Sequence, residues 1–211
     1  MIVGPNAPGL FLVFEGGEGA GKSTQASALA DYLVARGHAV TRTREPGGTP
    51  AAEAVRAVLL DPANAGLDDR AEALLFAASR GDHAAQVIRP ALHRGDIVIC
   101  DRFMDSSIAY QGVGRDLGMD RVAELSRWAT GGLRPDLTIV LDVDPAEGLS
   151  RVVGPDRLEA EPADWHRRVR QAFLDIAAAD PSRYLVLDAS RPAEDLAVEI
   201  AVQVETLVQD D

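Results

Sequence analysis

LFLVFEGGEGAGKST, residues 10–24, is the stretch that decides the fold of this chain. Its first five residues are apolar and rich in aromatic and branched side chains, which is typical of a buried strand. The strand leads into Gly16-x-x-x-x-Gly21-Lys22-Ser23, the spacing of a phosphate-binding loop. Glycines allow backbone angles at which successive N–H groups turn inward around a polyphosphate, and the following helix directs its positive end at the same phosphates. A chance glycine turn is the alternative, but the strand before the loop and the helix after it argue against that alternative.

Two side chains of this loop carry chemistry of their own. Lys22 is the only lysine among the 21 basic residues of the chain, and all the others are arginines. A lysine supplies a compact, mobile cation for the β- and γ-oxygens of a polyphosphate, where the planar fork of an arginine is less suitable. The hydroxyl group of Ser23 is placed to hold Mg²⁺. The loop therefore predicts a bound polyphosphate and Mg²⁺, although the loop alone would indicate only a P-loop protein.

The composition excludes several classes of protein. With 211 residues, of which 46% are hydrophobic, the chain has room for one domain with a full core. The net charge of −12 argues against a nucleic-acid-binding surface. A single cysteine, Cys100, rules out an internal disulfide and fits a reducing cytoplasm. No apolar run approaches the roughly 20 residues of a membrane span, so we expect no membrane association.

The start of the chain differs from the rest. Met1–Gly9 lacks the basic start and the apolar core of a signal peptide, so we expect a short leader there. Residues 10–211 are expected to form a single domain, because neither an internal repeat nor a low-complexity linker interrupts them.

Apolar runs that are typical of strands alternate with segments of helical periodicity along the whole chain. The expected strands are residues 10–14, 39–43, 97–100, 137–141 and 184–187. The expected helices are residues 24–36, 51–60, 69–94, 119–130, 164–179 and 193–208, with a short one that ends at residue 151. This alternation predicts an α/β fold in three layers, with a doubly wound, mostly parallel sheet of five strands.

Two turns directly after strands are expected to lie beside the phosphate loop, because the carboxyl ends of parallel strands meet at the ligand crevice. One is Arg44–Thr49, REPGGT, and the other begins with Asp101 and Arg102. Asp101 is suited to a direct or indirect Mg²⁺ contact, and Arg102 can fork onto a phosphate. The alternative is structural: Asp101 caps the next helix and Arg102 pairs with an acid.

Three other segments offer groups for a ligand. Phe76 and Arg80 stand four residues apart on an expected helix and so share a face. The alternative, which each residue taken alone favours, is that Phe76 belongs to the core and Arg80 is solvated. Residues 106–111, SSIAYQ, supply hydroxyl and amide groups that can read the edge of a base. Residues 151–163 interrupt the helical spacing with glycine, proline and charge, and we expect a flap there.

Four motifs taken together resemble the bacterial thymidylate kinases, a family within the P-loop nucleoside monophosphate kinases. They are FEGGEGAGKST, TREPGGT, the Asp101-Arg102 strand end and AYQGVGR. The resemblance extends from about Leu10 to the end of the chain. It implies a P-loop NTPase fold, a homodimer, and the reaction of ATP with dTMP to give ADP and dTDP in the presence of Mg²⁺.

The resemblance also implies roles for individual residues on the ATP side. The residues that would hold ATP are Gly16, Gly17, Glu18, Gly19, Ala20, Gly21, Lys22, Ser23 and Thr24, with Arg191 beside the adenine. Ser23 and Asp101 would hold the metal.

On the dTMP side, the resemblance assigns phosphate, base and sugar contacts. Arg56 and Arg102 would clamp the phosphate, Phe76 would stack on thymine and Arg80 would donate to its O4. The remaining contacts would come from Ser107 and Gln111 at the base and nearby phosphate groups, Tyr110 and Pro46 at the sugar, and Glu18 at the 3′-hydroxyl.

Members of this family carry a transition-state arginine either in the phosphate loop or in the flap. Because Gly19 stands at the loop position here, the flap should supply it, and Arg151 and Arg157 are the candidates. On this basis Arg157→Ala is expected to lower kcat far more than it raises KM. The later cluster of Arg167, Arg168 and Arg170 fits a solvated helix face better.

Two other functions are alternatives. The first is a kinase for a different nucleoside monophosphate or for a nucleoside, against which Phe76, Arg80 and the AYQG segment argue. The second is a nucleotide-dependent switch protein, which would need a hydrolysis device and an ordered switch loop. A switch would have no use for the arginines on the acceptor side.

Overall fold

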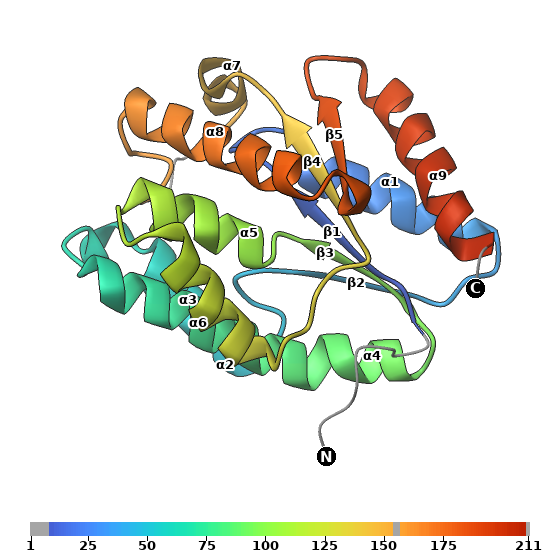
Figure 1. The fold of residues 1–211 in the computed structure, drawn as a ribbon, viewed down its shortest axis with the longest axis horizontal. Helices are drawn as coiled ribbons and strands as arrows, with labels where there is room; N and C mark the ends of the chain where they lie inside the picture. Colours follow the sequence, from blue (N-terminus) through green and yellow to red (C-terminus); the bar gives the residue numbers. More distant parts are fainter. Residues whose placement is uncertain (1–8, 154–156, 210–211) are drawn as a thin grey trace.

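The apolar runs form one parallel sheet in the computed structural model, which describes residues 9–153 and 157–209 (Figure 1). The strands are β1 (Phe11–Glu15), β2 (Val40–Arg44), β3 (Ile97–Asp101), β4 (Leu137–Asp142) and β5 (Tyr184–Asp188). Their order across the sheet is β2-β3-β1-β4-β5, and every neighbouring pair is parallel. The prediction of a five-stranded, doubly wound α/β fold is confirmed.

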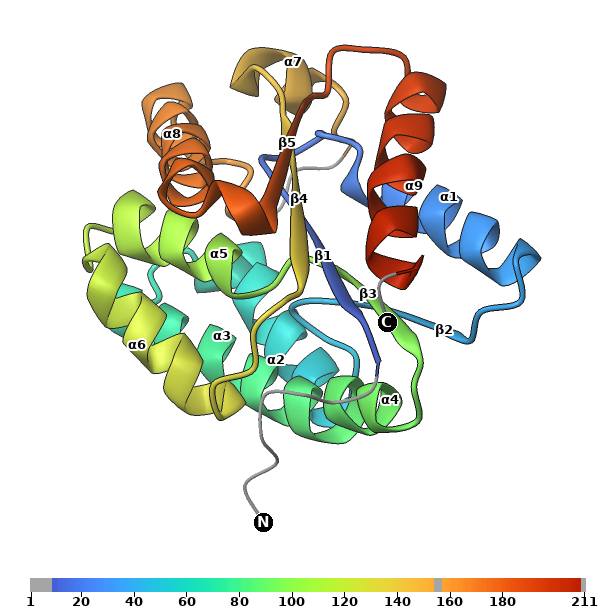
Figure 2. The same ribbon diagram turned by 45° about the vertical axis from the view of Figure 1, so that its right-hand side comes forward.

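Helices cover both faces of the sheet (Figures 1 and 2). One face carries α1 (Lys22–Ala35) and α9 (Ala193–Gln209), which contact each other. The helices of the other side are α2 (Pro50–Leu60), α3 (Asp69–His83), α4 (Arg89–His93), α5 (Met104–Ser107), α6 (Met119–Thr130) and α8 (Ala163–Ala179). A short helix, α7 (Pro145–Ser150), follows β4. The result is three layers with a core on each side of the sheet.

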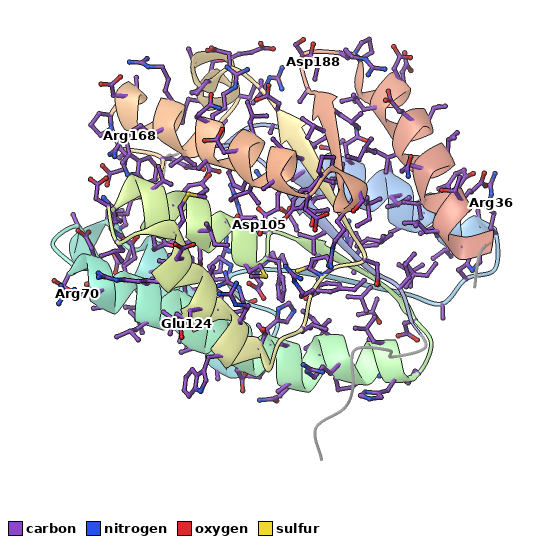
Figure 3. The ribbon with its side chains drawn as sticks, viewed as in Figure 1. Arg36, Arg70, Asp105, Glu124, Arg168 and Asp188 are labelled. Carbon is purple, nitrogen blue, oxygen red and sulfur yellow. The ribbon has the colours of Figure 1, made fainter. Side chains whose placement is uncertain are left out.

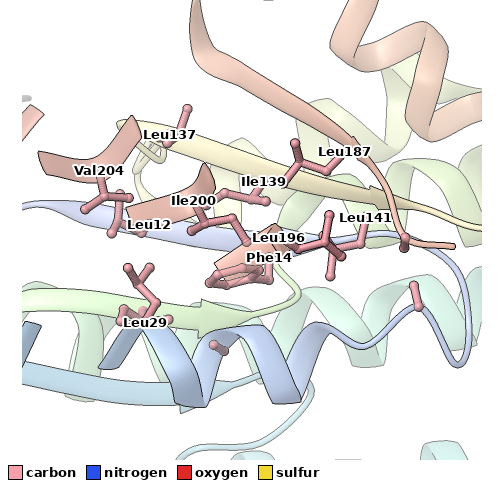
Figure 4. Close-up of a cluster of buried hydrophobic side chains, with 14 of the residues drawn as sticks. Leu12, Phe14, Leu29, Leu137, Ile139, Leu141, Leu187, Leu196, Ile200 and Val204 are labelled. Carbon is pink, nitrogen blue, oxygen red and sulfur yellow. The ribbon is translucent and has the colours of Figure 1, made fainter. Parts of the chain in front are cut away.

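The alternation of β1 shows how the two cores arise. Leu12 and Phe14 pack on the side of α1 and α9, within a cluster that Figure 4 shows. Phe11 and Val13 point to the opposite side and pack with α4, α5 and α6. All four are fully buried, because a strand between two helical layers has no solvent-exposed face.

Two helical segments depart from the expected pattern. The predicted helix over residues 69–94 is divided into α3, a π-helical segment (Ala84–Ile88) and α4. A second π-helical segment spans Ile108–Gly114 and overlaps residues 106–111, the stretch expected to contact the ligand. Residues 1–8 of the expected leader and residues 154–156 of the expected flap lie outside the described residues. Among those described, no helix is both long enough and apolar enough to cross a membrane.

Strand register brings the expected ligand-binding turns together. Phe14 of β1 pairs with Asp101 of β3, and Arg44 of β2 pairs with the same Asp101. The phosphate loop after β1, the turn after β2 and Arg102 after β3 therefore start at one edge of the sheet. This edge is the carboxyl end of the strands, where ligands bind in open parallel sheets.

We predict that truncation of Ile139 destabilises the fold. This side chain is fully buried in the core between β4 and the helices α1 and α9. Ile139→Ala should lower the free energy of unfolding by about 2–5 kcal/mol, since it removes buried methyl groups and leaves a cavity. Urea unfolding measures the change. Val186→Ala on β5, where the side chain is 45% exposed, is the control and should have little effect. Equal losses in the two variants would contradict this account of the core.

Candidate active site

Glycines allow the phosphate loop to pack closely against neighbouring backbone at two positions. Gly16 has a φ of 132° and Gly19 a φ of 63°, both in the region that favours glycine. A Cβ atom at Gly16 would lie 2.3 Å from the carbonyl oxygen of Leu141, and one at Gly19 would lie 1.9 Å from that of Gly148. Any side chain at these positions would therefore push the loop away from β4 and α7.

Lys22 is buried and turned back onto the loop. Its Nζ donates hydrogen bonds to the carbonyl oxygens of Gly16, at 3.1 Å, and Gly17, at 2.6 Å. Burial and the nearby charge of Arg102 lower the pKa of Lys22 to about 8. Glu18–Thr24, together with Asp101, Arg102 and Arg151, line a cavity over the loop, here called the loop cavity. A phosphate in this cavity would offer Lys22 a stronger partner than two carbonyl groups.

Ser23 and Asp101 meet at the foot of the loop cavity. The Ser23 hydroxyl donates to Oδ2 of Asp101 at 2.5 Å. A hydroxyl and a carboxylate are hard oxygen ligands of the kind that Mg²⁺ prefers, so this pair fits the ion. In the part of the chain that is described, no group of three or more histidine, cysteine or acidic residues could hold a metal.

Arg102 connects the loop to the opposite wall. Its φ of 70° is unusual for a residue other than glycine. Nη1 donates to the Gly16 carbonyl at 3.0 Å, and Nη2 pairs with Glu18 at 2.8 Å. The Tyr110 hydroxyl donates to the same Glu18 carboxylate at 2.6 Å. Although burial raises the pKa of Glu18, the charges of Arg102 and Lys22 hold it at about 2, so Glu18 is a carboxylate at neutral pH.

A second cavity, here called the arginine cavity, lies beside the loop. All the residues that the resemblance assigns to dTMP line it: Glu18, Pro46, Arg56, Phe76, Arg80, Arg102, Ser107, Tyr110 and Gln111. Residues far apart in the sequence are thus brought to one place. The guanidinium of Arg56 reaches the turn after β2, where Nη1 donates to the Pro46 carbonyl at 2.9 Å.

Arg80 is fixed in the wall of the arginine cavity and is only 2% exposed, so the alternative of a solvated side chain is wrong. Its Nε donates to Glu45 at 2.7 Å and its Nη1 to Ser126 at 3.1 Å. Nη2 donates to the Phe103 carbonyl and to the Ser107 hydroxyl. A guanidinium has five N–H groups, and among the described residues one N–H of Nη1 is left without a partner.

The two flap candidates lie in different places. Arg151 is partly exposed and lines the loop cavity, and its Nη1 donates to the Gly19 carbonyl at 3.2 Å. Arg157 is buried, with Nε donating to the Leu59 carbonyl at 3.0 Å and Nη1 paired with Glu72 at 2.6 Å. It does not stand among the described residues that line the loop cavity. The structure thus brings Arg151 to the loop and anchors Arg157 beside the far end of α2.

Of the remaining arginines of the sequence analysis, Arg167, Arg168 and Arg191 lie at the periphery, whereas Arg170 is partly buried and lines a small cavity with Gly17 and Glu18. Arg191 is exposed and pairs with Glu199 at 2.8 Å. Its segment is nevertheless close to the start of α1, because Gln25 donates to the Ala193 carbonyl at 2.8 Å. The ion pairs of the later cluster join Arg167 to Asp164, Arg168 to Asp116 and Arg170 to Asp142.

Three buried acids that the sequence analysis did not assign support this site. Glu15 accepts hydrogen bonds from the Phe103 and Ser106 backbone N–H groups and from the Ser106 hydroxyl. Glu45 holds Arg80 and His83. Glu72 pairs with Arg115 and Arg157. A signal was present in each case: Glu15 is the last residue of β1, Glu45 directly follows β2, and Glu72 lies one helical turn before Phe76.

Glu15 is a fully buried carboxyl group at the carboxyl end of β1. Burial, and then the charge of the nearby Asp105, raises the pKa of Glu15 to about 7. Asp105 itself lies in the interior, where it accepts a hydrogen bond from the Tyr184 hydroxyl at 2.7 Å and burial raises its pKa. By contrast, Arg36, Arg70, Glu124, Arg168 and Asp188 are exposed at the periphery (Figure 3).

A phosphate loop that faces a separate, arginine-lined cavity across one ion pair defines a class, the nucleoside monophosphate kinases of the P-loop fold. Comparison with known proteins gives the family. The family model described as Thymidylate kinase matches residues 14–200, and the chain belongs to the thymidylate kinase family.

Individual relatives agree with this assignment. A thymidylate kinase of Deinococcus radiodurans is 54% identical over 195 residues, which cover 91% of this chain and 94% of that protein. A thymidylate kinase of Leifsonia xyli is 52% identical over 204 residues, covering 95% and 96%. The crystal structure of thymidylate kinase from Ehrlichia chaffeensis superposes with a TM-score of 0.77 at 35% identity, covering 93% of this chain and 98% of that chain.

We predict that Glu15 makes the stability of the protein depend on pH. The folded chain keeps the Glu15 proton up to about pH 7, whereas an unfolded chain loses it near the ordinary value of 4.5. Stability should therefore fall as the pH rises from about 4.5 to about 7, and then level off. Glu15→Gln, whose amide can replace the hydrogen bonds, should gain about 1–3 kcal/mol relative to wild type across this range.

Urea unfolding at pH 5.0 and at pH 7.5 measures this difference. Glu124→Gln, at an exposed position on α6, is the control and should keep the pH dependence of the wild type. A Glu15→Gln variant with an unchanged pH dependence would show that Glu15 is ionised throughout.

Proposed function

We propose that this chain transfers the γ-phosphoryl group of ATP to dTMP, with Mg²⁺, and releases ADP and dTDP. The observation that supports this most directly is that the loop cavity and the arginine cavity share walls. Glu18, Glu45, Arg56 and Arg102 line both. Two ligands in these cavities would therefore meet end to end, as in-line transfer between two phosphate groups requires.

The loop cavity suits the triphosphate of ATP. The backbone N–H groups of Gly16–Thr24 and the N-terminus of α1 supply positive potential, and Lys22 would leave the Gly16 and Gly17 carbonyls for the β- and γ-phosphate oxygens. Arg191 would lie beside the adenine, since its segment contacts Gln25 through Ala193. Ser23 and Asp101 would hold Mg²⁺, which when bound neutralises charge on the transferring phosphate.

The arginine cavity suits a pyrimidine monophosphate. Arg56 and Arg102 would bind the acceptor phosphate, which is already ionised at neutral pH, so no protein base is needed. Phe76 would stack on the base, and the unpartnered N–H of Arg80 would donate to O4 of thymine. The fixed frame around Arg80 makes this contact selective, because a base without an acceptor there would leave a buried N–H unpaired.

The sugar end of the acceptor would lie against Glu18 and Tyr110. Their hydrogen bond of 2.6 Å fixes both side chains next to Arg102. The Glu18 carboxylate would accept from the 3′-hydroxyl, and Tyr110 would occupy the space that a ribose 2′-hydroxyl needs. Pro46 would close the cavity from the turn after β2.

For the flap, we assign Arg151 to the transferring phosphate. It reaches the phosphate loop at the Gly19 carbonyl, the position where a loop arginine would otherwise start. Arg157 would instead hold the edge of the arginine cavity, because Leu158 and Glu159 line that cavity next to it. The expected homodimer and cytoplasmic location stay predictions.

We predict that the purified protein with ATP and Mg²⁺ converts dTMP faster than UMP, dCMP or AMP. A coupled assay of ADP formation measures each acceptor. Lys22→Met should lower kcat for dTMP by about 100-fold or more, since it removes the cation at the transferring phosphate. Efficient use of another acceptor with dTMP unconverted would contradict the proposed substrate. ATP binding without conversion of any acceptor would favour the nucleotide switch.

We also predict different kinetic effects for the two flap arginines. Arg151→Ala should lower kcat by about 100-fold and change KM for dTMP little, because the charge acts on the transition state. Arg157→Ala should mainly raise KM for dTMP. Steady-state kinetics separate the two effects, and Arg167→Ala, at an exposed position on α8, is the matched control. A larger loss of kcat in Arg157→Ala than in Arg151→Ala would return the catalytic role to Arg157, which the sequence favours equally.

A further inference from the structure

Glu72 is a fully buried carboxylate that the proposed mechanism does not use. It lies on α3, one turn before Phe76 and two turns before Arg80, on the helix face that borders the arginine cavity. Glu72 itself is not among the described residues that line that cavity. Burying a charge is costly unless it is paired and hydrogen-bonded, so a fully buried acid beside a ligand cavity calls for a reason.

The contacts of Glu72 join three segments of the chain. Oε1 accepts from Nε2 of Gln111 at 2.9 Å and from Nε of Arg115 at 3.3 Å. Oε2 accepts from Nη2 of Arg115 at 3.3 Å and pairs with Nη1 of Arg157 at 2.6 Å. Two guanidinium groups thus neutralise the carboxylate, and one amide completes its set of donors.

The contact with Gln111 determines which way the amide points. A carboxylate only accepts hydrogen bonds, so the terminal group of the Gln111 amide that faces Glu72 has to be its NH₂ group. The amide oxygen of Gln111 then points away from Glu72. Gln111 is buried and lines the arginine cavity, and within the described residues its oxygen has no hydrogen bond. This oxygen is therefore available as an acceptor to a ligand in the cavity.

The cavity consequently presents both a donor and an acceptor to a base. Arg80 offers an N–H group, and Gln111 offers a carbonyl oxygen. Thymine and uracil carry an acceptor, O4, next to a donor, N3–H, and complement this pair. Cytosine carries a donor at the 4-position and an acceptor at N3, so it opposes both groups.

We propose that Glu72 is a positioning residue for base selection: it holds Gln111 with its oxygen toward the arginine cavity, so that the site prefers a pyrimidine that carries N3–H over cytosine. This rests on the proposed function, because the base of the acceptor has to enter the arginine cavity. Arg115 and Arg157 keep the carboxylate paired and so fix the position of the Glu72 side chain beside Gln111.

The test compares kcat/KM for dTMP, dUMP and dCMP in a double-mutant cycle of Glu72→Gln and Gln111→Met. A glutamine at position 72 both donates and accepts, so Gln111 is free to turn its NH₂ group toward the base. Glu72→Gln should lower the dTMP/dCMP ratio of kcat/KM about tenfold, the effect of one mispaired hydrogen bond. It should leave the dTMP/dUMP ratio unchanged, since both bases present the same edge. In the Gln111→Met background, Glu72→Gln should change neither ratio.

Asp69→Asn is the matched control, because it removes an exposed carboxylate that faces Arg115 but does not contact Gln111. It should keep the ratios of the wild type. A Glu72→Gln variant that loses activity equally with all three acceptors would overturn the proposal and leave Glu72 with a structural role. Gln111→Met retains Glu72 and both arginines, so it also tests the proposal if Glu72→Gln does not fold. An unchanged dTMP/dCMP ratio in Gln111→Met would overturn it.

These outcomes are distinct from failure of the proposed function itself. If the wild-type protein did not phosphorylate dTMP at all, the substrate assignment would be wrong. The ratio between dTMP and dCMP tests Glu72 only where the wild type uses dTMP.

Discussion

The ion pair between Arg102 and Glu18 joins the two halves of the site. Each side chain lines both cavities, and each is fixed by further contacts, Arg102 by the Gly16 carbonyl and Glu18 by the Tyr110 hydroxyl. The pair exists because Phe14 and Asp101 are partners in the parallel pairing of β1 and β3. A shift of this register by one residue would move every side chain of the strand to the other face, and the loop would no longer meet Arg102.

Around this pair, buried acids organise the arginine cavity. Glu15 ties the end of β1 to the start of α5, Glu45 fixes Arg80, and Glu72 connects α3 to Gln111 and Arg157. A buried ion pair adds little net stability, because desolvation offsets most of the attraction. Such pairs instead fix the orientation of the guanidinium group. A guanidinium with several fixed partners cannot move to accommodate a ligand of the wrong shape.

The sequence predicts the strands and the phosphate loop better than it predicts the buried acids that hold the site residues in place. The strands are short apolar runs between helices, and the phosphate loop has a fixed spacing, so both follow from local pattern. Glu15 and Glu72 could not be assigned in this way, since their partners lie 88 and 85 residues away in the chain, at Phe103 and Arg157. The burial of Arg80 likewise depends on its contacts with Ser126 of α6 and Ser107 of α5, which no periodicity encodes.

The cations of the site have protein partners, and this explains how an acidic chain can serve two anionic ligands. Lys22 donates to loop carbonyls, Arg102 pairs with Glu18, and Arg151 contacts Glu147 and the Gly19 carbonyl. Binding of phosphate therefore exchanges one set of partners for another instead of filling a strongly positive cleft. Because carbonyl groups are weaker partners than phosphate oxygens, the exchange at Lys22 and at Nη1 of Arg151 favours the ligand. At Arg102 the competing partner is a carboxylate, so in the proposed complex that arginine would stay bound to Glu18 and would present its remaining N–H groups to the acceptor in a fixed direction.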